Sequence, residues 1–237
     1  MLGFFQKKKR ITSETILQQL RQGGAKIGTD VVIYAPYNTT VDQTTPWMLT
    51  IGNHVRIAEG VKILTHDYAW SVLKHYSAGG IFGAVRPVEI GDCVFIGMNA
   101  VITSGVKIGS YVIIGAGAIV TKDCESGGVY AGNPAKRIMS IQQYYEKRQA
   151  CQVEEAKTLA RQYQERFGKK PPVEIFHEYF MLFMTRQEAE KIPQFQKQMA
   201  LLGNLEETVA YMDVNEPVFD GYEAFLKECC LGSKLQD

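Results

Sequence analysis

An aliphatic residue returns at every sixth position over a long stretch of the chain, and this period restricts the possible folds more than any other feature. A helix repeats apolar residues at spacings of three and four, and a half-buried strand at a spacing of two, so neither element explains it. Glycine or another small residue usually follows the aliphatic one. The longest unbroken run comprises Ile90, Ile96, Ile102, Ile108, Ile114 and Val120. An upstream block, three residues out of phase with this run, comprises Ile27, Ile33, Ile51, Ile57 and Ile63.

Short strands that each end in a bend account for this spacing. Glycine adopts such bends without steric cost, and three hexapeptides then complete one coil of a triangular prism. Successive coils stack at the ~4.8 Å spacing of hydrogen-bonded strands, which gathers the aliphatic residues into interior columns. A chance run of β-branched residues in an ordinary β-sandwich would not keep an unbroken period. We therefore predict a mainly β fold, a parallel β-helix built from hexapeptide coils.

Helices are predicted on both sides of this prism. Ser13 to Gln22, followed by two glycines, indicates a short helix that covers the open edge of the first coil. The hexapeptides stop after Pro134, and apolar residues then follow spacings of three and four from Ile141 to Phe167. Two further helical segments are expected, around Glu174 to Met184 and around Gly221 to Cys230. We expect three parts, namely an N-terminal helical cap at residues 1–26, a β-helix domain at 27–138 and an α-helical C-terminal extension at 139–237.

The period is interrupted at residues 64–87. The phase shift across this segment means that it does not fit into a wall of the prism, so we expect a loop that protrudes from it. Such a long excursion within a compact repeat is uncommon unless it serves a site or is disordered. Four aromatic residues make a disordered linker a poor explanation. They are Tyr68, Trp70, Tyr76 and Phe82.

Five short motifs give the chain a family resemblance. They are Ile51–Ile57, Thr65–Asp67, Val88–Gly97, Ile114–Asp123 and Ala131–Ala135, all within the segment from Ile51 to Ile138. In these motifs the chain resembles the hexapeptide-repeat acetyltransferases, above all the branch of galactoside, maltose and polysaccharide O-acetyltransferases. The resemblance implies a left-handed β-helix, acetyl-CoA as co-substrate, a hydroxyl acceptor, and a homotrimer with its active sites between adjacent subunits.

His66 is the candidate general base. Acetyl transfer to an alcohol requires removal of the hydroxyl proton, and imidazole takes and releases a proton near neutral pH. His66 lies where the regular coil ends and the loop begins, and the resemblance places the catalytic histidine of the family here. His75 is the second candidate, and a purely structural role for His66 is the alternative. Asp67, Glu89 or a backbone carbonyl are candidates for the group that orients the ring.

The resemblance also implies a site for the donor. Its residues are Phe95, Gly97, Met98, Ala116, Thr121, Lys122 and Lys136. A backbone N–H near Gly97 or Met98 would hold the oxyanion, and the two lysines would pair with CoA phosphates unless they are merely solvated. Two positions depart from the family pattern, since several relatives carry Trp at the position of Phe95 and a pair of arginines at those of Lys136 and Met139.

The acceptor contacts are expected in two places. The segment from Tyr34 to Trp47 lacks the repeat and resembles the part of the family that contacts the acceptor. Within it Asn38 and Asp42 offer an amide and a carboxylate for sugar hydroxyls, or simply form turns. In the loop, Trp70 offers an aromatic face for a sugar ring, or only pins the loop in place.

Composition excludes several other classes of function. Lys and Arg total 26 against 25 Asp and Glu, so no overall field attracts nucleic acid or an anionic membrane. No apolar run approaches the roughly 18 residues of a membrane span, and Lys7 to Arg10 is best explained as a solvated tail. An odd set of five cysteines without metal-ligand spacing favours reduced thiols and a cytoplasmic location.

The predicted function is therefore a cytoplasmic O-acetyltransferase that moves an acetyl group from acetyl-CoA to a carbohydrate-type hydroxyl. Acetylation of an antibiotic is the alternative within the same class. A metal-dependent prism is disfavoured, because the four histidines lack the paired spacing of a zinc site, and we expect no metal. A catalytically silent scaffold is the third reading, and the intact Thr-His-Asp and Thr-Lys-Asp elements argue against it.

Overall fold

A computed structural model describes residues 11–229, so the basic run at residues 7–10 and Cys230 lie outside the described residues. The chain divides into two compact units, residues 1–144 and 145–237. The boundary falls within α3 (Ile141–Phe167), later in the chain than residue 139, where the sequence predicts that the helical extension begins.

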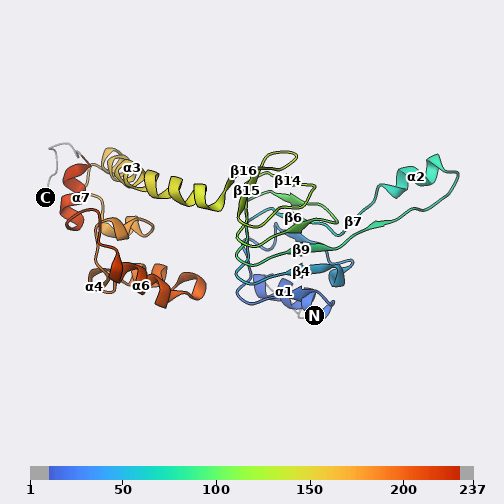
Figure 1. The fold of residues 1–237 in the computed structure, drawn as a ribbon, viewed down its shortest axis with the longest axis horizontal. Helices are drawn as coiled ribbons and strands as arrows, with labels where there is room; N and C mark the ends of the chain where they lie inside the picture. The colour runs from blue at the N-terminus through green and yellow to red at the C-terminus, as the bar shows by residue number, and fades with distance from the viewer. Residues whose placement is uncertain (1–10, 230–237) are drawn as a thin grey trace, which may run out of the picture. The chain divides into compact units, whose positions relative to one another are not determined.

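The first unit is a stack of coils whose strands form three sheets, one for each wall of a prism (Figure 1). The first wall contains β1 (Lys26–Ile27), β4 (Leu49–Ile51), β9 (Val88–Ile90) and β12 (Lys107–Ile108). The second contains β2 (Val32–Ile33), β5 (Arg56–Ile57), β10 (Phe95–Ile96), β13 (Ile113–Ile114), β15 (Gly128–Ala131) and β16 (Lys136–Ser140). The third contains β3 (Thr40–Val41), β6 (Lys62–Ile63), β11 (Val101–Ile102) and β14 (Ile119–Val120). The predicted left-handed parallel β-helix is confirmed.

The repeated aliphatic residues form continuous columns inside the prism. In the second wall the strand register pairs Ile33 with Ile57, Ile57 with Ile96, and Ile96 with Ile114. All four side chains are buried. Burial of one such side chain contributes about 1.5–3 kcal/mol, so the columns are the main source of cohesion between coils. Equivalent columns in the other two walls contain Ile27, Ile51, Ile90 and Ile108, and Val41, Ile63, Ile102 and Val120.

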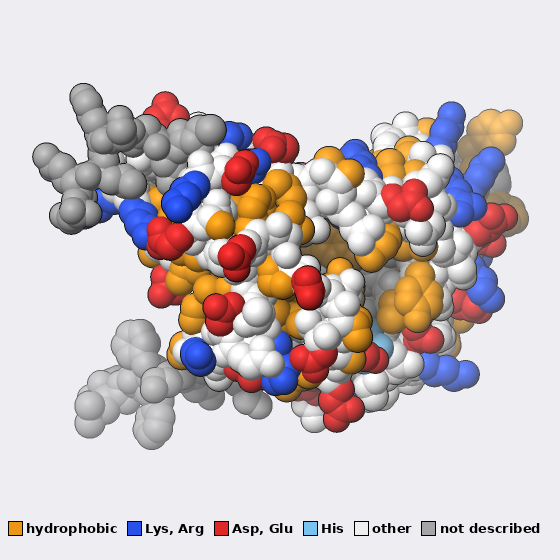
Figure 2. All heavy atoms as spheres, turned by 60° about the vertical axis from the view of Figure 1, so that its left-hand side comes forward, with side chains coloured by type: hydrophobic (Ala, Val, Ile, Leu, Met, Phe, Trp, Pro, Cys, Tyr) orange, Lys and Arg blue, Asp and Glu red, His pale blue; other side chains and the backbone are white. Residues whose placement is uncertain are grey.

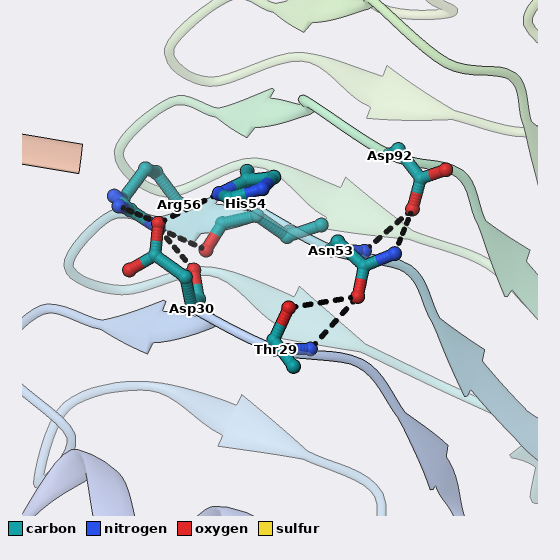
Figure 3. Close-up of polar contacts among 7 residues, drawn as sticks. Thr29, Asp30, Asn53, His54, Arg56 and Asp92 are labelled. Carbon is teal, nitrogen blue, oxygen red and sulfur yellow. Dashed lines mark hydrogen bonds and ion pairs between the residues drawn. The ribbon is translucent and has the colours of Figure 1, made fainter. Parts of the chain in front are cut away.

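Polar side chains join successive coils at the corner between the first and second walls (Figure 3). Asn53 Oδ1 accepts hydrogen bonds from Thr29 N at 2.9 Å and from Thr29 Oγ1 at 3.0 Å, and Asp92 Oδ1 accepts one from Asn53 N at 2.6 Å. Asp92 N then donates to Ser110 Oγ at 3.0 Å, and Ser110 N donates to Ser126 Oγ at 3.0 Å. This ladder supplies acceptors for backbone N–H groups at tight turns.

Asp30 and His54 form a contact pair beside the same ladder, and Arg56 also binds Asp30 (Figure 3). His54 Nδ1 lies 2.9 Å from Asp30 Oδ2, and Arg56 Nη2 donates to the same oxygen at 2.7 Å. Burial alone would raise the pKa of Asp30, but the hydrogen bonds from Arg56 and His54 hold it below its ordinary value. The His54 side chain is 51% exposed, so this pair belongs to the prism surface.

The helix α1 (Ser13–Gln22) has the bounds that the sequence predicts and packs under the first coil. Its apolar face is buried in the prism core. Ser13 Oγ accepts a hydrogen bond from Ile33 N at 2.9 Å, which satisfies a donor on the otherwise open edge of β2. At the opposite end of the stack, β15 pairs with β13, and β16 then turns back antiparallel to β15.

The segment at residues 64–87 leaves the prism wall and extends away from it (Figure 1). Its base is an antiparallel pair of short strands, β7 (His66–Asp67) and β8 (Ala84–Val85), and its tip carries α2 (Trp70–Tyr76). No residue of α2 is buried. The loop therefore has little core of its own.

The second unit is helical, with an aromatic core that includes Phe176, Phe183, Phe195 and Phe225. After α3 its elements are η2 (Val173–Phe176), η3 (Phe180–Leu182), α4 (Arg186–Ala189), α5 (Pro193–Met199), η4 (Leu201–Gly203), α6 (Leu205–Val214) and α7 (Gly221–Glu228). The predicted helix from Ile141 to Phe167 is confirmed, and α7 matches the predicted C-terminal helix.

One predicted helix in this unit is wrong. The segment around Glu174 to Met184 contains the two short 3₁₀ turns η2 and η3 instead of one helix. Apolar residues occupy most of its positions, so no polar face specifies a regular helix. Aromatic rings of this segment pack into the core instead, and the ring centroids of Phe176 and Phe225 lie 5.3 Å apart in an edge-to-face contact.

Figure 2 shows charged side chains of both signs interspersed with apolar ones. This distribution agrees with the near balance of basic and acidic residues. Among residues 11–229, no helix is long and apolar enough to cross a membrane.

Candidate active site

His66 and Asp42 form a close pair at one corner of the prism. Asp42 follows β3 and His66 follows β6, and these two strands are neighbours in the third wall. The two residues therefore lie in adjacent coils, and His66 Nδ1 is 2.5 Å from Asp42 Oδ2. The sequence did not identify this contact of His66, since Asp67, Glu89 and a backbone carbonyl were the candidates.

Asp42 is held rigidly by the segments on both sides of it. The residue is 6% exposed. Its Oδ2 accepts hydrogen bonds from Thr65 Oγ1 at 2.6 Å and from Thr65 N at 3.1 Å, and its Oδ1 accepts one from Thr44 N at 2.9 Å. Burial alone would raise the pKa of Asp42, but these hydrogen bonds and the one from His66 hold that pKa well below its ordinary value. The carboxylate is therefore charged at neutral pH.

This geometry fixes the tautomer of a neutral His66 ring. A carboxylate oxygen only accepts hydrogen bonds, so Nδ1 carries the hydrogen and Nε2 carries the lone pair. The His66 side chain is 29% exposed, which leaves part of the ring accessible. An imidazole with a free lone pair and a buried carboxylate behind it is suited to take a proton from a hydroxyl.

A pocket of about 440 Å³ opens in front of this pair. Asp42 and His66 line it together with Ile16 from α1 and Leu64. The rest of its lining is Val41 and four side chains with hydroxyl or amide groups, namely Thr39, Thr40, Gln43 and Thr44. A small polar molecule would reach His66 through this pocket.

The proposed donor residues fall into separate groups within one chain. Gly97, Met98 and Ala116 meet at the corner between the second and third walls, where Gly117 N donates to Met98 O at 2.8 Å. Met98 is half-exposed, as is Phe95 on β10. A Cβ on Gly97 would lie 2.6 Å from Ala116 N, so the stacking of the coils itself requires glycine there.

The other three predicted donor residues lie elsewhere. Thr121 and Lys122 follow β14, in the third wall, which places them at the corner that also carries Asp42 and His66. Lys136 begins β16 and pairs with Ala131 of β15. All three side chains are exposed.

The remaining predicted acceptor residues are not brought to the His66 pocket. Asn38 lies in the turn between β2 and β3, and its Nδ2 donates to Glu59 Oε1 at 2.5 Å. Trp70 belongs to α2 in the loop, where its ring packs 5.0 Å from that of Tyr68. His75, the second candidate base, is exposed on α2. Within the part of the chain that the structure describes, no group of three or more His, Cys, Asp or Glu residues could hold a metal ion.

Sequence comparisons agree with this fold. Residues 87–122 match the family model "Bacterial transferase hexapeptide (six repeats)". Protein CapG of Staphylococcus aureus is 42% identical over 142 residues, which cover 60% of this chain and 78% of CapG.

Two solved structures are also similar to this chain. A maltose O-acetyltransferase from Clostridium difficile has 27% identity and a TM-score of 0.43, with 58% of this chain and 79% of that chain covered. The polySia specific acetyltransferase NeuO has 31% identity and a TM-score of 0.39, with 48% and 50% covered. The hexapeptide columns, the family match and the extent of the similarity to CapG lead to one assignment. The chain belongs to the hexapeptide-repeat family of acyltransferases.

Proposed function

We propose that this protein transfers an acetyl group from acetyl-CoA to a hydroxyl of a carbohydrate acceptor, with His66 as general base and Asp42 as its positioning residue. The observation that carries the proposal is the contact between His66 Nδ1 and Asp42 Oδ2 at the wall of a polar pocket. An oriented imidazole beside a cavity of hydroxyl and amide groups suits the activation of a sugar hydroxyl.

The reaction follows from this arrangement as a direct transfer in a ternary complex. His66 Nε2 takes the acceptor's hydroxyl proton while the oxygen attacks the thioester carbonyl. The charged Asp42 stabilises the imidazolium that forms. When the tetrahedral intermediate collapses, the bond between carbon and sulfur breaks, the thiolate of CoA leaves and His66 returns the proton to it. The products are an acetyl ester and CoA with a free thiol, and His66 is neutral again.

Acetyl-CoA is proposed to bind along the edge of the prism at Phe95, Gly97, Met98 and Ala116. The half-exposed Phe95 and Met98 offer an apolar surface for the pantetheine arm. The backbone N–H of Met98 is the proposed oxyanion donor, because the Gly97 N–H already donates to Ile114 O at 2.8 Å. Thr121, Lys122 and Lys136 complete the proposed donor site, in which the lysines would pair with phosphates.

A homotrimer is part of this proposal. The apolar donor residues lie at the corner between the second and third walls, whereas His66 lies at the next corner of the same chain. A ring of three copies would bring the donor corner of one chain to His66 of the next. The cytoplasm is the proposed compartment, in keeping with the free thiols of Cys93, Cys124, Cys151 and Cys229 among the described residues.

Release of CoA thiol from acetyl-CoA in the presence of sugars tests the proposed function. We expect His66→Ala to lower kcat by at least about 10²-fold, the usual contribution of a general base. His54→Ala is the matched control, because His54 also pairs with an aspartate but lies at a different corner. An unchanged rate in His66→Ala, with an intact fold by circular dichroism, would remove His66 from the role of base.

A further inference from the structure

A second pocket, of about 550 Å³, adjoins the one that contains His66. Ile16, Thr39 and Gln43 line both pockets, so the two are neighbours. The second pocket runs from these shared residues along α1, between that helix and the turn that contains Pro36 and Tyr37. A molecule whose reacting group lies at His66 would therefore have a direction in which to extend.

The chemistry of this second pocket is polar but uncharged. Its described lining contains no Lys, Arg, Asp or Glu. The side-chain amides of Gln18, Gln19 and Gln22 line it, and none of them has a hydrogen-bond partner in the described part of the chain. Tyr37 adds a ring that is 71% exposed. These three amides are exposed, so they are free to exchange hydrogen bonds with water for hydrogen bonds with a ligand in the pocket.

These groups fit a neutral sugar better than a phosphate or an anionic glycan. Amides both donate and accept hydrogen bonds, which sugar hydroxyls require, and an aromatic ring offers a face for the apolar side of a pyranose. A phosphate or carboxylate would instead call for arginine or lysine. Arg21 of α1 does not line the pocket, and its guanidinium donates to Gly28 O at 3.1 Å and lies 3.6 Å from Glu14.

The sizes of the pockets bear on the length of the acceptor. Each pocket alone falls within the roughly 300–1,000 Å³ that is ordinary for a small-ligand site. The His66 pocket thus has room for the sugar unit that is acetylated, and the second pocket remains for units that follow it.

We infer that the acceptor is an uncharged oligosaccharide of at least two sugar units, whose reacting unit lies at His66 and whose next units lie along α1 against Gln18, Gln22 and Tyr37. This inference rests on the proposed function and specifies its acceptor. It excludes a nucleotide-linked sugar as the preferred substrate, because the diphosphate would meet no cation among the described lining residues.

Release of CoA thiol with a panel of acceptors of graded length and charge tests the inference. The neutral arms are glucose, maltose, maltotriose, N-acetylglucosamine and chitotriose, and the charged arms are a sialic acid trimer and UDP-N-acetylglucosamine. We expect a neutral trisaccharide to exceed its own monosaccharide at least roughly tenfold in kcat/KM, as several added hydrogen bonds would give. We also expect it to exceed both charged arms.

Two substitutions test whether the preference for a trisaccharide depends on the second pocket. In Gln18→Ala and Gln22→Ala the ratio of the two kcat/KM values, trisaccharide over monosaccharide, should fall roughly three- to tenfold, mainly through KM for the trisaccharide. Gln194→Ala, at an exposed glutamine of α5, is the matched control and should keep the wild-type ratio.

The outcomes separate the inference from the proposed function. Equal use of monosaccharides and trisaccharides, a preference for a charged arm, or an unchanged ratio in both glutamine variants would overturn the inference while leaving the acetyltransferase proposal in place. Absence of thiol release with every acceptor would reject both.

Discussion

Replacing Asp42 by asparagine tests the pairing that underlies the proposed mechanism. The substitution keeps the size of the side chain but removes the charge that lies 2.5 Å from His66 Nδ1. If the amide oxygen faces His66, the hydrogen bond survives without the charge that stabilises imidazolium. If the amide nitrogen faces it, Nδ1 must accept, and Nε2 then carries the hydrogen and loses its function as a base. Both orientations predict a lower kcat.

The size of the effect follows from the kind of contact that is lost. A hydrogen bond to a charged group contributes about 1.5–3 kcal/mol, and each 1.36 kcal/mol changes a rate tenfold. We therefore expect kcat to fall about 10- to 150-fold, with KM for acetyl-CoA nearly unchanged because Asp42 is not among the proposed donor residues. Steady-state kinetics with varied acetyl-CoA, at saturating acceptor, measures both parameters.

A matched pair in the same chain serves as the control. Asp30 contacts His54 at 2.9 Å, also across adjacent coils, but at another corner of the prism. Asp30→Asn should keep the wild-type kcat, whereas Asp42→Asn should not. Wild-type kcat in a folded Asp42→Asn protein would refute the assignment of Asp42 as the positioning residue, and equal losses in both variants would show that only prism stability had been measured.

Three further predictions concern the stability of the fold. Ile96→Ala should lower the free energy of unfolding by about 2–5 kcal/mol, because Ile96 is fully buried in the central column, whereas Ile138→Ala, at a residue 55% exposed, should change it little in urea unfolding. Gly97→Ala should lower the melting temperature, because its Cβ would lie 2.6 Å from a backbone nitrogen of the next coil. Gly83→Ala, with open space around it, should not, and equal melting temperatures of the two variants would contradict the close stacking of coils at Gly97. The hydrogen bonds that lower the pKa of Asp42 stabilise the fold above the unfolded pKa of about 3.9, and this stabilisation is lost as the pH falls through the lower folded pKa. The unfolding free energy of Asp42→Asn should therefore change less between neutral and acidic pH than that of the wild type.

The walls of the prism could be predicted because the six-residue period of aliphatic residues is visible in the sequence itself. Each hexapeptide supplies one strand, and the aliphatic residue at its repeat position takes its place in a column without help from distant parts of the chain. The same logic identified the loop, since residues 64–87 break the phase. The helix from Ile141 to Phe167 was equally accessible, because its apolar spacing is local.

The partner of His66 could not be predicted because the repeat fails where it was needed. Between Ile33 and Val41 the spacing is eight residues, and between Val41 and Ile51 it is ten, so the six-residue count loses register. Only the pairing of β3 with β6 shows that Val41 lies opposite Ile63. With that register, Asp42 lies beside the start of the loop, next to His66.

The closures at the two ends of the stack have a consequence for how copies of this chain can meet. A solenoid of parallel strands with bare ends would act as a template on which another solenoid could continue, and such growth leads to filaments. Here α1 lies under one end and the reversed strand β16 limits the other. The number of coils is thereby set within each molecule, and the proposed trimer would form through the flanks of the prism, where growth can stop at a closed ring.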